Sequence, residues 1–182
     1  MLKTFLIVTA QWVLAIMNTR QPSTPWAYSY GETSTAIAEA ANADPLSHDP
    51  EGAIRTASIL IAMAEHESAF HPNAIGDHGA SLGLFQIQPP TARVDGTLLL
   101  VPRTAAPVAI DLIRTSFRVC GKRPWEERLA WYAAGGDHCA DNHRAVKASR
   151  DMLNLAKYIF EHHKQELVAP AEAGQAALAT TP

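Results

Sequence analysis

The segment from Glu67 to Pro89 reads ESAFHPNAIGDHGASLGLFQIQP and predicts the end of a helix followed by turns. Upstream of it, apolar residues recur at the spacing of one helix face: Ile54, Ala57, Ile61 and Ala64. The helix should begin at Asp49-Pro50-Glu51, where an N-cap candidate precedes a proline and an acidic residue. Pro72 should end it, because proline disfavours helical geometry in the residue before it. The pattern therefore predicts a long helix with Glu67 in its last turn.

The rest of the chain predicts a mainly helical fold class. Gly76-Asp77-His78-Gly79 is a turn cluster, and Ser81–Gln88 is too short and too broken by glycine for a long helix. A turn with one small strand is expected there. Further helices are expected over Ala106–Val119, over Trp125–Ala134 and from about His143 to His163. The expected architecture is one domain of about five helices with a minimal strand and turn region.

Four regions are expected along the 182 residues. Residues 1–29 are typical of a signal peptide or an N-terminal anchor, because a short basic start precedes an apolar run from Phe5 to Met17. Residues 30–48 lack a sustained apolar period, which predicts a linker. Residues 167–182 have almost no bulky side chains, which predicts a disordered tail. Between them, residues 49–166 are enough for a single hydrophobic core.

The charge of the chain argues against nucleic acid as a partner. The formal net charge is −3, and the 15 Lys and Arg residues are scattered along the sequence. A nucleic-acid groove needs basic residues clustered with aromatic ones. We therefore expect no nucleic-acid partner.

The chain has two cysteines, Cys120 and Cys139, on either side of the helix expected over Trp125–Ala134. In an exported protein, an even number of cysteines indicates a disulfide, which would hold that helix in place. Two buried free thiols are the alternative in a cytosolic protein. A two-cysteine zinc site is a third interpretation, with His138 beside Cys139 as one further ligand.

Glu67 is the candidate acid of the chain. At about 100 degrees per residue, it lies at the margin of the apolar stripe, so its carboxyl should be partly removed from water. It also lies in the last turn of the helix, where the negative end of the helix dipole disfavours a carboxylate. Both effects raise the pKa of the carboxyl. A carboxylic acid that is still protonated near neutral pH can protonate a glycosidic oxygen.

The eight histidines of the chain raise the possibility of a metal site. His66-Glu67 followed by His71 is close to a zinc-protease helix, whose two histidines lie four residues apart on one face. Here they are five residues apart, which places them about 140 degrees apart around the helix, and Pro72 ends the helix. We therefore expect no metal ligands and no cofactor.

Two segments resemble the signature of lytic transglycosylases with a lysozyme-like domain. The first, Glu67–Pro89, has that family's Glu-Ser pair, a Phe and a Pro, then Gly-Ala and Gly-Leu-x-Gln at fixed offsets. The second, Leu129–Gly135, reads LAWYAAG and is similar to the family's Ala-Tyr-Asn-Ala-Gly segment. The resemblance covers the core from about Ile54 to Gly136 and implies a lysozyme-like fold.

The chain departs from the family pattern at four places. One extra residue separates Gly79-Ala80 from Gly83, Phe85 stands where Met is usual, His71 stands where Asn is usual, and Ala133 replaces the Asn after the tyrosine. These departures resemble a divergent phage-associated or plasmid-associated branch. They change the expected contacts with substrate but leave the acid in place.

The resemblance implies cleavage of the MurNAc-GlcNAc β-1,4 bond in peptidoglycan glycan strands. Glu67 would protonate the leaving oxygen and then accept the proton of the sugar's own 6-hydroxyl, which gives a 1,6-anhydro product. The N-acetyl group of the substrate would assist, in place of a second carboxylate. Ser68, Gln86 and Tyr132 would contact the substrate. Each of the three also has a structural interpretation. Gln86 can be an amide that stabilises a turn, and Tyr132 can be a core aromatic residue. Ser68 is interpreted as mainly structural.

The same resemblance places the protein in the periplasm or outside the cell, with a virion or an inner-membrane anchor as alternatives. A phage, secretion or conjugation assembly is one candidate partner, and remodelling of the cell's own wall is the alternative context.

Two other functions fit the sequence. A lysozyme-like hydrolase that uses water needs a second carboxylate, for which Asp77 and Asp95 are the candidates. Both lie in turn-like segments, which predicts a surface or capping role for them. A non-catalytic domain that binds glycan within an assembly is the third interpretation. The masses of the products distinguish a transglycosylase from a hydrolase. A Glu67→Gln variant distinguishes either enzyme from a non-catalytic binding domain.

Overall fold

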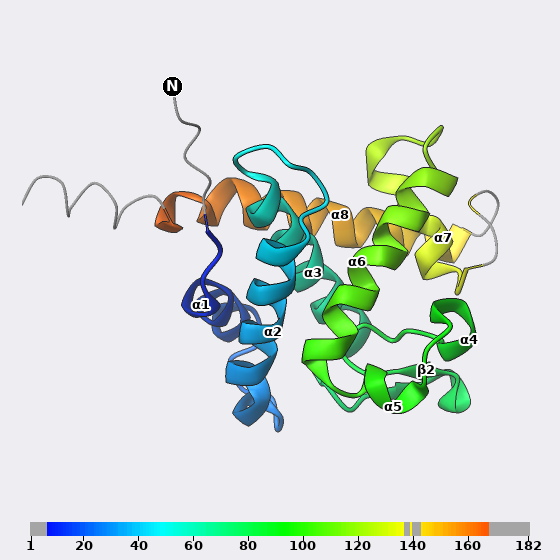
Figure 1. Ribbon diagram of the computed structural model, residues 1–182, viewed down its shortest axis with the longest axis horizontal. Helices are drawn as coiled ribbons and strands as arrows, with labels where there is room; N and C mark the ends of the chain where they lie inside the picture. The colour runs from blue at the N-terminus through cyan, green and yellow to red at the C-terminus, as the bar shows by residue number, and fades with distance from the viewer. Residues whose placement is uncertain (1–6, 137–138, 140–142, 168–182) are drawn as a thin grey trace, which may run out of the picture.

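The computed structural model describes residues 7–136, 139 and 143–167. Figure 1 shows a mainly helical molecule with one small sheet, which confirms the predicted fold class. The helices are α1 (Ala10–Arg20), α2 (Tyr30–Ala43), α3 (Gly52–Ser68), α4 (Pro89–Ala92), α5 (Gly96–Leu99), α6 (Pro102–Val119), α7 (Ala130–Ala133) and α8 (His143–His163). The 3-10 turns are η1 (Ala27–Ser29), η2 (Asp77–Gly79) and η3 (Trp125–Glu127), and the strands are β1 (Ile75–Gly76) and β2 (Ser81–Leu82). The predicted tail, apart from Leu167, lies outside the described residues.

Helix α3 is the central helix of the core and confirms the helix predicted before Pro72. Its residues from Ile59 to Ala64 are all buried, so the helix is apolar on every side there rather than along one stripe. It starts at Gly52, later than predicted, because the Asp49 carboxylate accepts a hydrogen bond from the backbone N–H of Glu51 (2.9 Å) and holds a turn.

Helix α3 ends through its backbone, four residues before Pro72. Ala69 and Phe70 adopt left-handed conformations, with φ of 49° and 65°. The backbone N–H of Ala69 donates to the carbonyl of Glu65 (2.9 Å) and that of Phe70 donates to the carbonyl of Ala64 (3.0 Å), so carbonyls of the last turn have partners. The side chain of Phe70 is buried in the core, which fixes the direction in which the chain leaves the helix.

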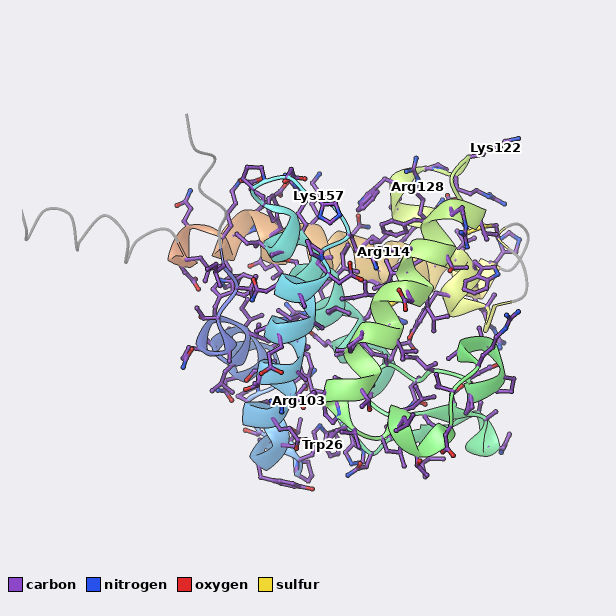
Figure 2. All side chains as sticks on the ribbon, in the orientation of Figure 1. Trp26, Arg103, Arg114, Lys122, Arg128 and Lys157 are labelled. Atoms are coloured by element: carbon purple, nitrogen blue, oxygen red, sulfur yellow. A yellow bond between two sulfur atoms is a disulfide. The ribbon has the colours of Figure 1, made fainter. Side chains whose placement is uncertain are left out.

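Residues 30–48 are not the linker that the sequence predicts. Helix α2 occupies Tyr30–Ala43, and its buried residues include Ile37 and Ala41. Arg103 and Arg114 of α6, both labelled in Figure 2, form ion pairs with Glu39 and with Asp44 just after α2. The prediction failed because α2 packs mainly through alanine, serine and threonine, whose small side chains give little hydrophobic periodicity.

Part of the segment expected to be a signal peptide or anchor packs in the core. Helix α1 buries Trp12, Val13, Ile16 and Met17, and the Arg20 side chain donates two hydrogen bonds of 2.8 Å to the Glu65 carboxylate on α3. Within residues 7–136 and 143–167, no helix combines the length and the apolar character that a membrane crossing requires.

The helix predicted over Trp125–Ala134 is broken into η3 and α7. The Ser116 hydroxyl of α6 donates to the carbonyl of Arg128 (2.8 Å) and accepts from the N–H of Tyr132 (3.2 Å). The Ser149 hydroxyl of α8 accepts from the N–H of Leu129 (2.9 Å). Side chains from two flanking helices therefore replace the helical hydrogen bonds at the break. Helix α8 has the bounds predicted for it.

A disulfide joins Cys120, just after α6, to Cys139. The two Cα atoms are 5.4 Å apart, within the usual range for a disulfide. This excludes the alternatives of free thiols and of a two-cysteine zinc site; His138 lies outside the described residues. The crosslink closes a loop that contains η3 and α7, and α7 carries Tyr132.

We expect that replacing both cysteines by serine lowers the free energy of unfolding by about 3 kcal/mol, since the crosslink no longer restricts the unfolded chain. Urea denaturation of the wild type and the double variant measures this. Titration with a thiol reagent under denaturing, non-reducing conditions is the control and should find no free thiol in the wild type. Two reactive thiols per wild-type chain would contradict the crosslink.

Candidate active site

A cavity of about 250 Å³ is lined by residues from the end of α3, the β1–β2 hairpin, α4, α6 and α7. Figure 1 shows how these elements are arranged. Its lining is mostly polar and includes three titratable side chains: Glu67, Asp77 and Tyr132. The other lining residues are Ser81, Gln86, Ile87, Gln88, Thr91, Leu112, Trp131, Ala133 and Gly135. The cavity thus brings together both segments that the sequence singled out.

Glu67 lies in the last turn of α3 and faces this cavity. Burial, and after it the negative charge of Asp77, raise the pKa of its carboxyl from 4.5 to about 7. Burial acts because the charged form loses its hydration. The partial desolvation expected from the helix margin is therefore confirmed. Near neutral pH this carboxyl can both donate and accept a proton.

Tyr132 is buried on α7 and lines the same cavity. Its hydroxyl donates a hydrogen bond to the backbone carbonyl of Phe85. Burial, and after it the negative charge of Glu67, hold the pKa of the phenol well above its ordinary value, so the phenol stays neutral. Since the phenol donates its proton to the carbonyl of Phe85, its oxygen can bind a ligand only by accepting a hydrogen bond.

Gln86 lines the cavity and also stabilises the turn around it. Its amide nitrogen donates to the backbone carbonyls of Gly83 (2.9 Å) and Ala74 (3.1 Å). Its carbonyl oxygen lies so close to Gly76 that a Cβ atom there would be 2.1 Å away. The turn-stabilising interpretation of the amide is therefore confirmed, and its oxygen is the group left for a ligand.

Ser68 is placed differently from the substrate contact that the resemblance implied. Its hydroxyl lies 2.8 Å from the carbonyl oxygen of Leu84 and 3.1 Å from that of Ala64, and it does not line the cavity. It ties the end of α3 to the segment that follows β2. The structure thus supports the mainly structural interpretation, because the hydroxyl contacts backbone carbonyls and Ser68 is absent from the cavity lining.

Asp77 and Asp95, the two candidates for a second carboxylate, are separated by the fold. Asp95 caps α5, where its carboxylate accepts from the N–H of Thr97 (2.8 Å), as the capping interpretation predicts. Asp77 instead lies at the cavity that contains Glu67, and the hydroxyl of buried Ser81 donates to its Oδ2 (2.5 Å). Asp77 is exposed, as predicted for a turn residue, but its exposed side chain also lines the cavity, which the sequence did not indicate.

Several other residues that line the cavity were not predicted. Thr91 donates from its hydroxyl to the carbonyl of Gly135 (2.8 Å), which joins α4 to the turn after α7. Gln88 also contacts Gly135, and a Cβ atom at Gly135 would be 2.8 Å from its amide nitrogen. Trp131 lines the same cavity. Its position directly before Tyr132 is the one sequence signal that could have identified it.

The histidines next to Glu67 do not form a metal site. His66 is exposed, and the ring of His71 packs on the ring of Trp26 with centroids 4.5 Å apart. In the described part of the chain, no three His, Cys, Asp or Glu side chains are grouped as metal ligands. The site is therefore an arrangement of carboxyl, phenol, amide and hydroxyl groups.

A family model described as the Transglycosylase SLT domain matches residues 53–155, more than half of the chain. The matched range contains every residue that lines the cavity. No curated protein and no solved structure matches the chain.

Proposed function

Because the chain belongs to the transglycosylase SLT family, we propose that it is a peptidoglycan lytic transglycosylase in which Glu67 is the acid and then the base. The observation that carries this proposal is the Glu67 carboxyl in the family domain, lining a polar cavity with a pKa of about 7. Such a group is protonated often enough to be an acid at neutral pH and ionised often enough to be a base.

The proposed reaction has two proton transfers through the same carboxyl. Protonated Glu67 donates to the glycosidic oxygen as the bond to the MurNAc anomeric carbon breaks, and the N-acetyl carbonyl oxygen of the substrate bonds to that carbon. The 6-hydroxyl oxygen of the same sugar then replaces the acetamido oxygen, and its proton passes to the Glu67 carboxylate. The product is a 1,6-anhydro sugar, no water is consumed, and Glu67 is protonated again.

The neighbouring side chains position the substrate in this proposal. Gln86 offers its carbonyl oxygen and Tyr132 its phenol oxygen, since the protons of both groups already bind backbone carbonyls. These acceptors suit the N–H and O–H groups of an N-acetylated sugar. Both residues are fixed by their backbone partners, which keeps the acceptors oriented before the substrate arrives.

The substrate of the family implies where the protein works. We propose that it acts on peptidoglycan in the periplasm or outside the cell, through an exported, virion-borne or membrane-anchored form. A phage-associated or plasmid-associated context remains part of this proposal, on the basis of the departures at His71, Phe85 and Ala133.

Mass spectrometry of fragments released from purified peptidoglycan tests the proposal. A 1,6-anhydro end is about 18 Da lighter than a reducing end, because no water has been added. We expect anhydro ends among the products of the wild-type protein. If cleavage leaves reducing ends alone, the transglycosylase assignment is wrong. If neither kind of end forms although the protein binds glycan, the non-catalytic interpretation replaces it.

A further inference from the structure

We propose that Asp77 gives this site a second activity: it activates a water molecule that cleaves the same glycosidic bond by hydrolysis, in parallel with the transglycosylase reaction. This inference rests on the proposed function, since Glu67 remains the acid in both reactions. It begins from one structural fact. The cavity contains two carboxyl groups, on α3 and on η2, where the proposed transglycosylase reaction uses one.

The Asp77 carboxylate is held in place and still has an oxygen to offer. Its Oδ2 accepts the hydrogen bond from the buried Ser81 hydroxyl. Within the described residues, its Oδ1 accepts no hydrogen bond and its carboxylate forms no ion pair. The side chain is exposed at the cavity, so bulk water reaches it directly. An oriented carboxylate oxygen with access to water is what a general base requires.

The backbone around Asp77 is left-handed over three consecutive residues. Asp77, His78 and Gly79 are consecutive residues with φ of 48°, 56° and 96°. A left-handed conformation costs a residue with a side chain roughly 1 kcal/mol, although aspartate and asparagine tolerate it better than most. Strain of this kind persists where the surrounding structure holds it, often at functional sites. Here the left-handed turn carries the residue whose carboxylate lines the cavity.

The hydrolytic step balances with the two carboxyl groups and one water. The water oxygen bonds to the anomeric carbon as the bond from that carbon to the leaving oxygen breaks. Asp77 accepts a proton from the water, and Glu67 donates its proton to the leaving oxygen. The products are a reducing end and a free hydroxyl on the leaving sugar. Proton exchange with solvent then returns Asp77 to its ionised form and Glu67 to its acid form.

Asp77→Asn is a close test of this role. Asparagine tolerates the left-handed backbone, and its side-chain oxygen can still accept from Ser81, so only the charge and the basicity are lost. Ser81→Ala keeps the carboxylate and removes its support. The matched control is Asp95→Asn, the same substitution at a helix cap outside the cavity. The full-length proteins are incubated with purified peptidoglycan, and anhydro and reducing ends are quantified by mass.

We expect the wild type to release both kinds of end. In Asp77→Asn, reducing ends should fall about 100-fold, whereas anhydro ends should fall much less, because Glu67 loses only the part of its raised pKa that the Asp77 charge causes. Ser81→Ala should lower reducing ends by less, and Asp95→Asn should change neither product. Wild-type products with anhydro ends alone would overturn the role of Asp77 and leave the transglycosylase proposal standing. Equal loss of both ends in Asp77→Asn, or unchanged reducing ends, would also overturn it. Absence of both ends in the wild type would instead refute the proposed function.

Discussion

Replacing Glu67 by glutamine is expected to lower the rate of peptidoglycan cleavage by about 1,000-fold or more, while glycan binding is retained. Glutamine has nearly the same shape as glutamate but can neither donate an acidic proton nor accept one. The cavity lining is otherwise unchanged, so the substrate should still bind. The measurement is the rate of release of soluble fragments, with sedimentation of the protein on insoluble peptidoglycan as the binding readout.

The stability of the same variant provides a control that a misfolded protein would fail. Because the folded-state pKa of Glu67 is raised from 4.5 to about 7, the folded protein binds a proton more tightly than the unfolded chain does. The wild type therefore loses stability as pH rises from about 4.5 to 7, whereas Glu67→Gln does not. At pH 8 the variant should be more stable by roughly 3 kcal/mol, with no difference below pH 4. Unchanged cleavage by a folded Glu67→Gln protein would refute the mechanism.

Gly83→Ala is expected to lower the free energy of unfolding by about 4 kcal/mol. A Cβ atom at Gly83 would be 1.8 Å from the backbone carbonyl oxygen of Leu99, and φ at Gly83 is 74°. The backbone N–H of Gly83 also donates to the carbonyl of Ala74 (2.8 Å), which restrains Gly83 from moving away from Leu99. A side chain at this position would therefore collide with the backbone of Leu99. Urea denaturation measures the loss.

The matched control for this substitution is Gly79→Ala. Gly79 also has a positive φ, 96°, but a Cβ atom there would meet no other atom within 4 Å. Only the backbone strain should appear, at about 1 kcal/mol. A Gly83→Ala protein no less stable than Gly79→Ala would show that the contact with Leu99 does not constrain the fold.

The parts of the fold that sequence reasoning predicted are those with strong local signals. Helix α3 has an apolar pattern and a following proline, and helix α8 has a clear amphipathic pattern, so both were expected close to where they lie. Helix α2 was missed because it is built from small residues whose burial depends on α1 and α6. The break between η3 and α7 was missed because the serines that stabilise it come from α6 and α8. Such long-range contacts leave no local pattern.

The same distinction holds within the site. Glu67 was identified because its helix position and its motif can both be read from the sequence. The placement of Asp77 could not be read from its turn-like neighbours, because it depends on how the β1–β2 hairpin packs against the end of α3. The hydrogen bonds of Ser68, Gln86 and Tyr132 to backbone carbonyls also depend on that packing. The sequence therefore predicted which residues lie near the site. It did not predict which of them hold the backbone in place and which are free to act on a substrate.

The most direct test of the raised pKa of Glu67 is the titration of its own carboxyl. Carbon-13 NMR of the folded protein with labelled glutamate side chains follows each carboxyl with pH, and the signal missing from Glu67→Gln assigns the residue. A midpoint at about pH 7 is expected, because burial and the charge of Asp77 both disfavour ionisation. A midpoint near the ordinary value of 4.5 would contradict the account, because such a carboxyl would be almost fully ionised at neutral pH.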